Sequence, residues 1–109
     1  MGKFEIYKDA SQEFRFRLKA ANGQVILSSE GYSAKSGCTN GIESVRKNGT
    51  QDSRFERLES KSGKPYFNLK ASNGQVIGSS QMYASVESME NGIRSVKKNA
   101  EDASVEDLS

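Results

Sequence analysis

The chain has 109 residues, of which 34% are apolar and 28% are charged, a balance typical of one small soluble globular domain. Its apolar runs fall short of the roughly 20 residues of a membrane span and its N-terminus lacks signal-peptide features, so we expect no membrane attachment. The single cysteine excludes an intramolecular disulfide and suits a reducing cytoplasm, and the lack of histidine excludes Ser-His-Asp catalysis and imidazole zinc sites.

The sequence is duplicated. Residues 4–49 align without a gap with residues 55–100, and both copies contain NGQVI and end in NGIxSVxKN. Two copies favour a pseudo-symmetric single domain over residues 1–109, because repeat arrays usually need three or more units. The acidic residues 101–109 hold few apolar groups, so we expect them to form a disordered tail.

Each copy is expected to fold as three strands and a helix. The first strands cover 4–8 and 55–59, and polar turns follow them. The second strands begin at Phe14 and Pro65 and alternate in polarity, which predicts a sheet buried on one face. The fold class is therefore α+β: two tandem β-β-β-α repeats with an antiparallel sheet of about six strands and both helices on one face.

Asn22-Gly23 and Asn73-Gly74 predict two-residue hairpin turns between the second and third strands. Such a turn sets Leu18 opposite Leu27 and Lys19 opposite Ile26. Ile26 and its copy Ile77 are then expected on the solvent face, unless a bulge turns them inward.

The helices are expected at 34–47 and 85–98, with Ser33 and Ser85 as N-caps. Gly41 and Gly92 lie beside the apolar stripe of each helix, which indicates a close approach of helix and sheet. The predicted core comprises Phe4, Phe16, Leu18, Val25, Ile42, Val45, Phe55, Phe67, Leu69, Val76, Met89, Ile93 and Val96. Two ways of joining the halves remain open: the third strands pair with each other, or a first strand crosses to the partner sheet.

The stretch KAxNGQVIxSS at 19–29 and 70–80, followed by Tyr32 or Tyr83 and then NGIxSVxKN, resembles the YegP-like family of small bacterial proteins. The resemblance covers both repeats. It implies a fold of two β-β-β-α units and no established activity, so no catalytic residue is carried over.

The solvent face of the sheet is the candidate contact surface, with an apolar centre framed by cations. Its members are Tyr7, Arg15, Arg17, Lys19, Ile26, Leu58, Tyr66, Lys70 and Ile77. We expect a monomeric, non-enzymatic binding module without cofactor or metal, whose partner is a protein or an anionic ligand. The alternative is a single-stranded nucleic-acid-binding protein that uses the same basic face.

Overall fold

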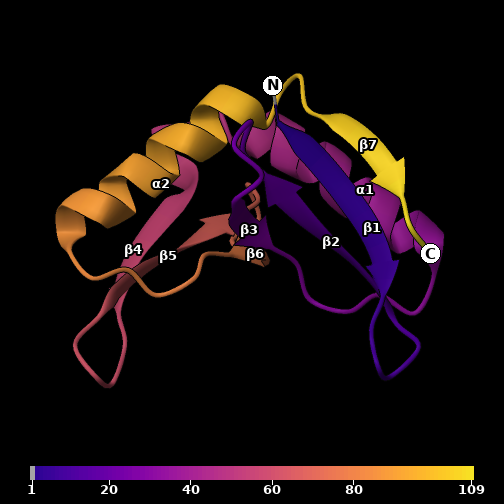
Figure 1. The fold of residues 1–109 in the computed structure, drawn as a ribbon, viewed down its shortest axis with the longest axis horizontal. Helices are drawn as coiled ribbons and strands as arrows, with labels where there is room; N and C mark the ends of the chain where they lie inside the picture. The colour runs from indigo at the N-terminus through magenta and orange to yellow at the C-terminus, as the bar shows by residue number, and fades with distance from the viewer. Residues whose placement is uncertain (1) are drawn as a thin grey trace.

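The computed structural model describes residues 2–109 as one sheet with two helices (Figure 1). Its elements follow in chain order: β1 Lys3–Lys8, β2 Phe14–Lys19, β3 Val25–Ser28, α1 Lys35–Asn48, the 3-10 turn η1 Asp52–Arg54, β4 Phe55–Glu59, β5 Pro65–Lys70, β6 Val76–Ser79, α2 Val86–Asn99 and β7 Ser104–Asp107. The α+β class and the tandem β-β-β-α order are as the sequence predicts. No helix within residues 2–109 has the length and apolar character needed to cross a membrane.

The two repeats join through their third strands. The sheet order is β4-β5-β6-β3-β2-β1-β7, and β3 pairs with β6 at Ser28 and Ser79. A pseudo-twofold relation therefore exchanges β1 with β4, β2 with β5 and β3 with β6. Of the two arrangements that the sequence left open, the direct pairing of third strands is the one observed.

The turns at Asn22-Gly23 and Asn73-Gly74 are one residue longer than expected. Ala20 and Gln24 close the first turn by a hydrogen bond of 2.9 Å from the Ala20 N–H to the Gln24 carbonyl, and Gly23 takes the positive φ of 85°. This is a type I turn with a glycine bulge. In this register Lys19 lies opposite Val25. The register then shifts by one residue, so that Leu18 lies opposite Leu27.

The predicted exposure of Ile26 and Ile77 is consequently wrong. The shift puts an extra residue into β3, so Ile26 and Leu27 both turn toward the helices. Ile26 is 5% exposed and Ile77, where β6 has the same shift, is 8% exposed. Val25 and Val76, expected in the core, are half-buried on the opposite face.

The core lies between the sheet and the helices, and every other predicted core residue is buried. Gly41 allows the close approach that the sequence indicates, because a Cβ there would lie 2.6 Å from the Tyr32 hydroxyl oxygen and 2.9 Å from the Phe16 ring. The second repeat builds the same contact from Gly92, Tyr83 and Phe67. Ser85 is an N-cap as expected and accepts a hydrogen bond from the Ser88 N–H, whereas α1 begins after Ala34 instead of Ser33.

The expectation of a disordered tail is also wrong. Residues 104–107 form β7, a seventh strand that runs parallel to β1 (Figure 1), so the sheet is mixed. The Leu108 N–H donates to the Ile6 carbonyl at 2.7 Å, and Lys3 and Lys35 bind the carboxylates of Glu106 and Asp107 at 3.2 and 2.6 Å. Backbone hydrogen bonds and ion pairs order the tail. The prediction considered only its apolar residues and therefore missed these contacts.

Candidate functional site

The face of the sheet opposite the helices is the candidate site, and we call it the open face. Alternation along the strands places every second side chain there. In the first repeat these are Arg15, Arg17 and Lys19, which flank the buried Phe16 and Leu18 on β2. The second repeat presents Tyr66, Asn68 and Lys70 at the equivalent positions of β5.

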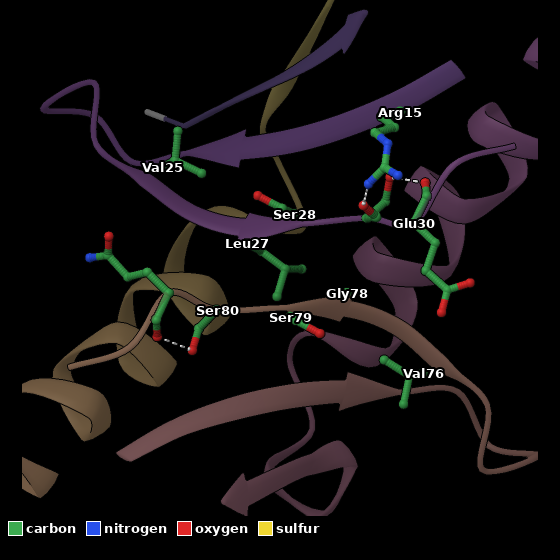
Figure 2. Close-up of a pocket in the computed structure, with 11 residues that line it drawn as sticks. Arg15, Val25, Leu27, Ser28, Glu30, Val76, Gly78, Ser79 and Ser80 are labelled. Atoms are coloured by element: carbon green, nitrogen blue, oxygen red, sulfur yellow. Dashed lines mark hydrogen bonds between the residues drawn. The ribbon is translucent and has the colours of Figure 1, made fainter. Parts of the chain in front are cut away.

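A hollow of about 370 Å³ marks the centre of the open face, where β3 meets β6. Val25 and Val76 lie at opposite ends of it, with Ser28 and Ser79 between them on the paired strands (Figure 2). Arg15 reaches its rim from β2. The hollow thus combines the two valines with four serines, Gln81, the Arg15 guanidinium group and the Glu30 carboxylate.

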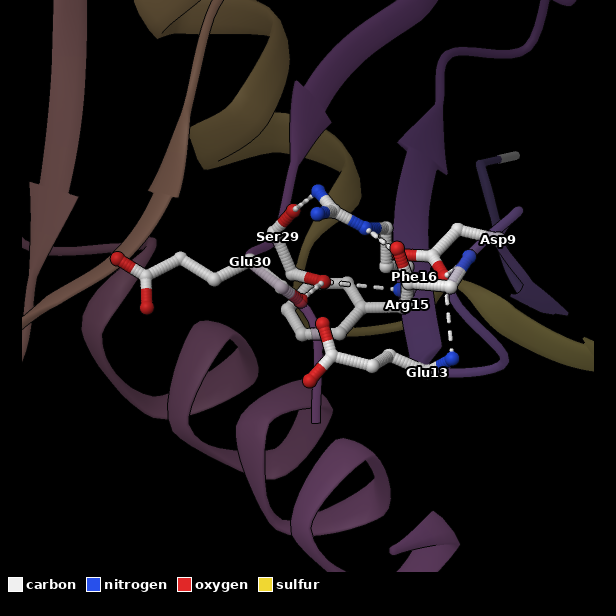
Figure 3. A network of polar contacts seen from close by, with 7 residues as sticks. Asp9, Glu13, Arg15, Phe16, Ser29 and Glu30 are labelled. Atoms are coloured by element: carbon white, nitrogen blue, oxygen red, sulfur yellow. Dashed lines mark hydrogen bonds and ion pairs between the residues drawn. The ribbon is translucent and has the colours of Figure 1, made fainter. Parts of the chain in front are cut away.

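Arg15 is held in place by groups from two loops (Figure 3). Its Nε donates to the Asp9 carboxylate at 2.6 Å, and its Nη1 donates to the Ser29 carbonyl at 3.3 Å. The hydrogen bond from Arg15 lowers the pKa of Asp9, and the same contact raises the pKa of Arg15. A guanidinium group carries five N–H donors, so this fixed side chain retains donors for a ligand.

Glu5 is surrounded by three cations of the open face. Its carboxylate lies 2.7 Å from Arg17 Nε, 3.1 Å from Lys19 Nζ and 3.9 Å from Lys3 Nζ, and its side chain is 6% exposed. The hydrogen bond from Arg17 lowers the pKa of Glu5. The Arg17 guanidinium also covers the Tyr7 ring at 4.5 Å from its centroid. Lys3 is also paired with Glu106 of β7, so Glu5, Arg17 and Lys19 together leave one net positive charge in this cluster.

The second repeat makes the other half nearly neutral. Lys70 pairs with Glu56 at 3.1 Å, and the Ser79 hydroxyl donates to the Asn68 side-chain oxygen at 2.7 Å. Leu58 and Tyr66 lie directly opposite each other on β4 and β5. The open face therefore carries a cluster of largely paired cations over the first repeat and is more apolar over the second.

The open face presents cations and hydrogen-bond donors, which are groups that complement an anion. Cys38 lies on the opposite side of the sheet, fully buried on α1, where burial raises its pKa to about 11. Within residues 2–109, no group of three acidic or cysteine side chains is placed to hold a metal ion. Guanidinium, ammonium and hydroxyl groups are the donors that the open face offers.

Seven of the nine predicted contact residues share the open face, namely Tyr7, Arg15, Arg17, Lys19, Leu58, Tyr66 and Lys70. Ile26 and Ile77 lie on the helix-covered face instead, so the predicted apolar centre does not exist there. The centre of the open face is lined instead by Val25, Val76, Ser28 and Ser79. The serine pair, repeated at 28–29 and 79–80, is the signal in the sequence that could have pointed to this centre.

The fold and site together define a class: a duplicated α+β protein whose repeats share one sheet. A model of the family described as "Domain of unknown function (DUF1508)" matches residues 9–56 and 60–107. Each matched unit begins at the turn before the second strand and ends with the next first strand or with β7.

The chain belongs to this family, whose curated members are the UPF0339 (YegP-like) proteins. It is 62% identical over 104 residues to a UPF0339 protein encoded in the 5′ region of the ptx operon of Stutzerimonas stutzeri, covering 95% of this chain and 94% of that one. The solution NMR structure of Escherichia coli yegP, a protein of unknown function, is 51% identical and superposes with a TM-score of 0.93, covering 98% of this chain and 92% of that one. A UPF0339 protein from Shewanella oneidensis gives 50% identity, a TM-score of 0.92 and coverages of 98% and 91%.

Proposed function

We propose that this protein is a non-enzymatic binding module whose open face receives an anionic ligand. The observation that carries the proposal is the placement of Arg15 at the rim of the hollow at the β3–β6 seam, with Arg17 two residues further along β2 on the same face. Both side chains are fixed by acidic partners before any ligand arrives, so little side-chain entropy is lost on binding.

The asymmetry of the open face supports a ligand of mixed character. A negatively charged group would meet the cations of β2, and an apolar portion would lie over Val25 and Val76 toward the second repeat. Glu5 neutralises one of the charges that surround it, which favours a small anion over an extended polyanion.

The test measures binding of inorganic pyrophosphate and citrate to the full chain by calorimetry. We expect Arg15→Gln and Arg17→Gln each to weaken binding, because a charge-assisted hydrogen bond contributes about 1.5–3 kcal/mol. Lys47→Gln is the matched control, since Lys47 is an exposed cation on α1. Failure of both probes to bind at low salt, or equal weakening by Lys47→Gln, would contradict the proposal.

Single-stranded nucleic acid is the second candidate, and the row of cations on β2 favours it. Alternate residues of a strand are separated by about 6.8 Å, and a base could stack on the Arg17 guanidinium plane, which itself covers the Tyr7 ring. The measurement that separates the two candidates is the affinity for oligothymidylate at two salt concentrations. Three phosphate contacts predict a slope of about −2 in log affinity against log salt, from about −0.7 per contact. A slope near zero would leave the small-anion proposal standing alone.

A further inference from the structure

The two edges of the sheet differ although the repeats are equivalent. On one edge, β7 covers β1, and on the other edge no strand of residues 2–109 lies beside β4. The backbone of β4 is available there. Arg57 lies opposite Phe67 of β5. The Phe67 N–H donates to the Ser80 hydroxyl and the Phe67 carbonyl accepts the Ser80 N–H, so neither group bonds to β4. The Arg57 N–H and carbonyl therefore point away from β5, toward the uncovered edge. In the first repeat the equivalent Ile6 carbonyl accepts the Leu108 N–H of the tail.

A hollow of about 480 Å³ lies beside this edge, between β4, the start of β5 and the start of α2. Pro65, Val86, Met89 and Leu58 provide its apolar lining. Val86 is 62% exposed, although it is a valine in the first turn of a helix. Large exposed apolar groups beside an uncovered strand edge are features of peptide-binding sheets.

The equivalent place in the first repeat is filled. Phe14 stands where the second repeat has Pro65, and its ring is covered by the ammonium groups of Lys8 and Lys35 at 5.1 and 5.6 Å from the centroid. Lys35 in turn binds Asp107 of β7 at 2.6 Å. The second repeat has Pro65, Glu59 and Val86 at the positions of Phe14, Lys8 and Lys35, so it lacks the ring and both lysines. It also has no added strand beside β4 within residues 2–109.

We infer that the edge of β4 binds an extended segment of another polypeptide, which pairs with the Arg57–Glu59 backbone and inserts an aromatic side chain into this hollow. The aromatic group would take the place that the Phe14 ring has in the first repeat. A lysine or arginine two residues from it in the segment would point to the same face and complement Glu59 at the rim, since Glu90 is already bound to Arg57. This site is separate from the open face.

The test is an NMR titration of the full isotope-labelled chain with a synthetic peptide of residues 101–109 that carries Asp107→Phe and Ser109→Lys. We expect shifts of the amides of Leu58, Glu59 and Val86–Glu90. The control peptide carries Ser109→Lys alone and should give none of these shifts. A chain with Pro65→Phe and Val86→Lys restores the first repeat's filling, so it should fold normally and bind the aromatic peptide at least about tenfold more weakly.

Several outcomes would overturn the inference. These are an absence of shifts at millimolar peptide, equal shifts with the control peptide, or shifts confined to β1, which would mean exchange with the chain's own tail. Self-association of the chain without peptide that Val86→Lys abolishes would show that the occupant is a second copy and not another polypeptide.

Discussion

Glu5→Gln should change stability and anion binding in opposite directions. The substitution keeps the shape of the side chain but removes the charge that three cations share, with nitrogens at 2.7, 3.1 and 3.9 Å. Hydrogen bonds between charged groups contribute about 1.5–3 kcal/mol, so we expect the free energy of unfolding to fall by about 2 kcal/mol. The same change adds one positive charge to the open face, and the affinity for pyrophosphate should therefore rise.

The dependence on pH identifies the cause. The pKa of Glu5 lies below its ordinary value of 4.5, so its contribution is complete above pH 4.5 and is lost as the pH falls through the folded-state pKa. Urea denaturation at a series of pH values should accordingly show the two proteins converging in strongly acid solution.

Glu56→Gln is the matched control in the second repeat. Its carboxylate is 38% exposed and binds Lys70 alone among the ion pairs of residues 2–109, so its loss should cost less than about 1 kcal/mol. Equal costs for the two variants, or a lower pyrophosphate affinity for Glu5→Gln, would refute the view of Glu5 as the counter-ion of the open face.

Three further predictions concern the fold. Ile42→Ala and Ile93→Ala should each lower the free energy of unfolding by about 2–5 kcal/mol, and values within about 0.5 kcal/mol of wild type by chemical denaturation would contradict their burial. Gln12 has φ 65° where the second repeat has Gly63 at φ 83°, so Gln12→Gly should stabilise by about 1 kcal/mol and Gly63→Gln should destabilise, as thermal melts can test. Cys38, whose pKa is raised to about 11 by burial, should react with iodoacetamide at neutral pH far more slowly in the native chain than in urea, and equal rates would contradict its burial.

The sequence was sufficient for the six strands and two helices of the repeats and for their order, because polarity alternates along the strands and recurs every three to four residues in the helices. It failed at the turn after β2. A two-residue and a three-residue turn both use Asn-Gly, and the difference of one residue exchanges Val25 and Ile26 between the two faces. The added bulge depends on how the strand packs against the helices, and local sequence propensities carry no information about that packing.

The prediction of a disordered tail failed for a different reason. The stability of the tail comes from the unpaired edge of β1 and from Lys3 and Lys35, all far away in the sequence. For the open face, alternation correctly grouped the cations of β2 with Lys70. It could not identify Val25 or Ser79 as neighbours of Arg15, because the pairing of β3 with β6 joins the two repeats and has no local signature.

The most direct test of the open-face proposal is the location of bound anion on the full chain. In an NMR titration with pyrophosphate at low salt, we predict that the largest amide shifts cluster at Arg15, Arg17, Ser28 and Ser79. The exposed cations Lys47 and Lys98 at the ends of the helices should be unaffected. Shifts centred on those helix ends, or scattered evenly over the surface, would contradict the account.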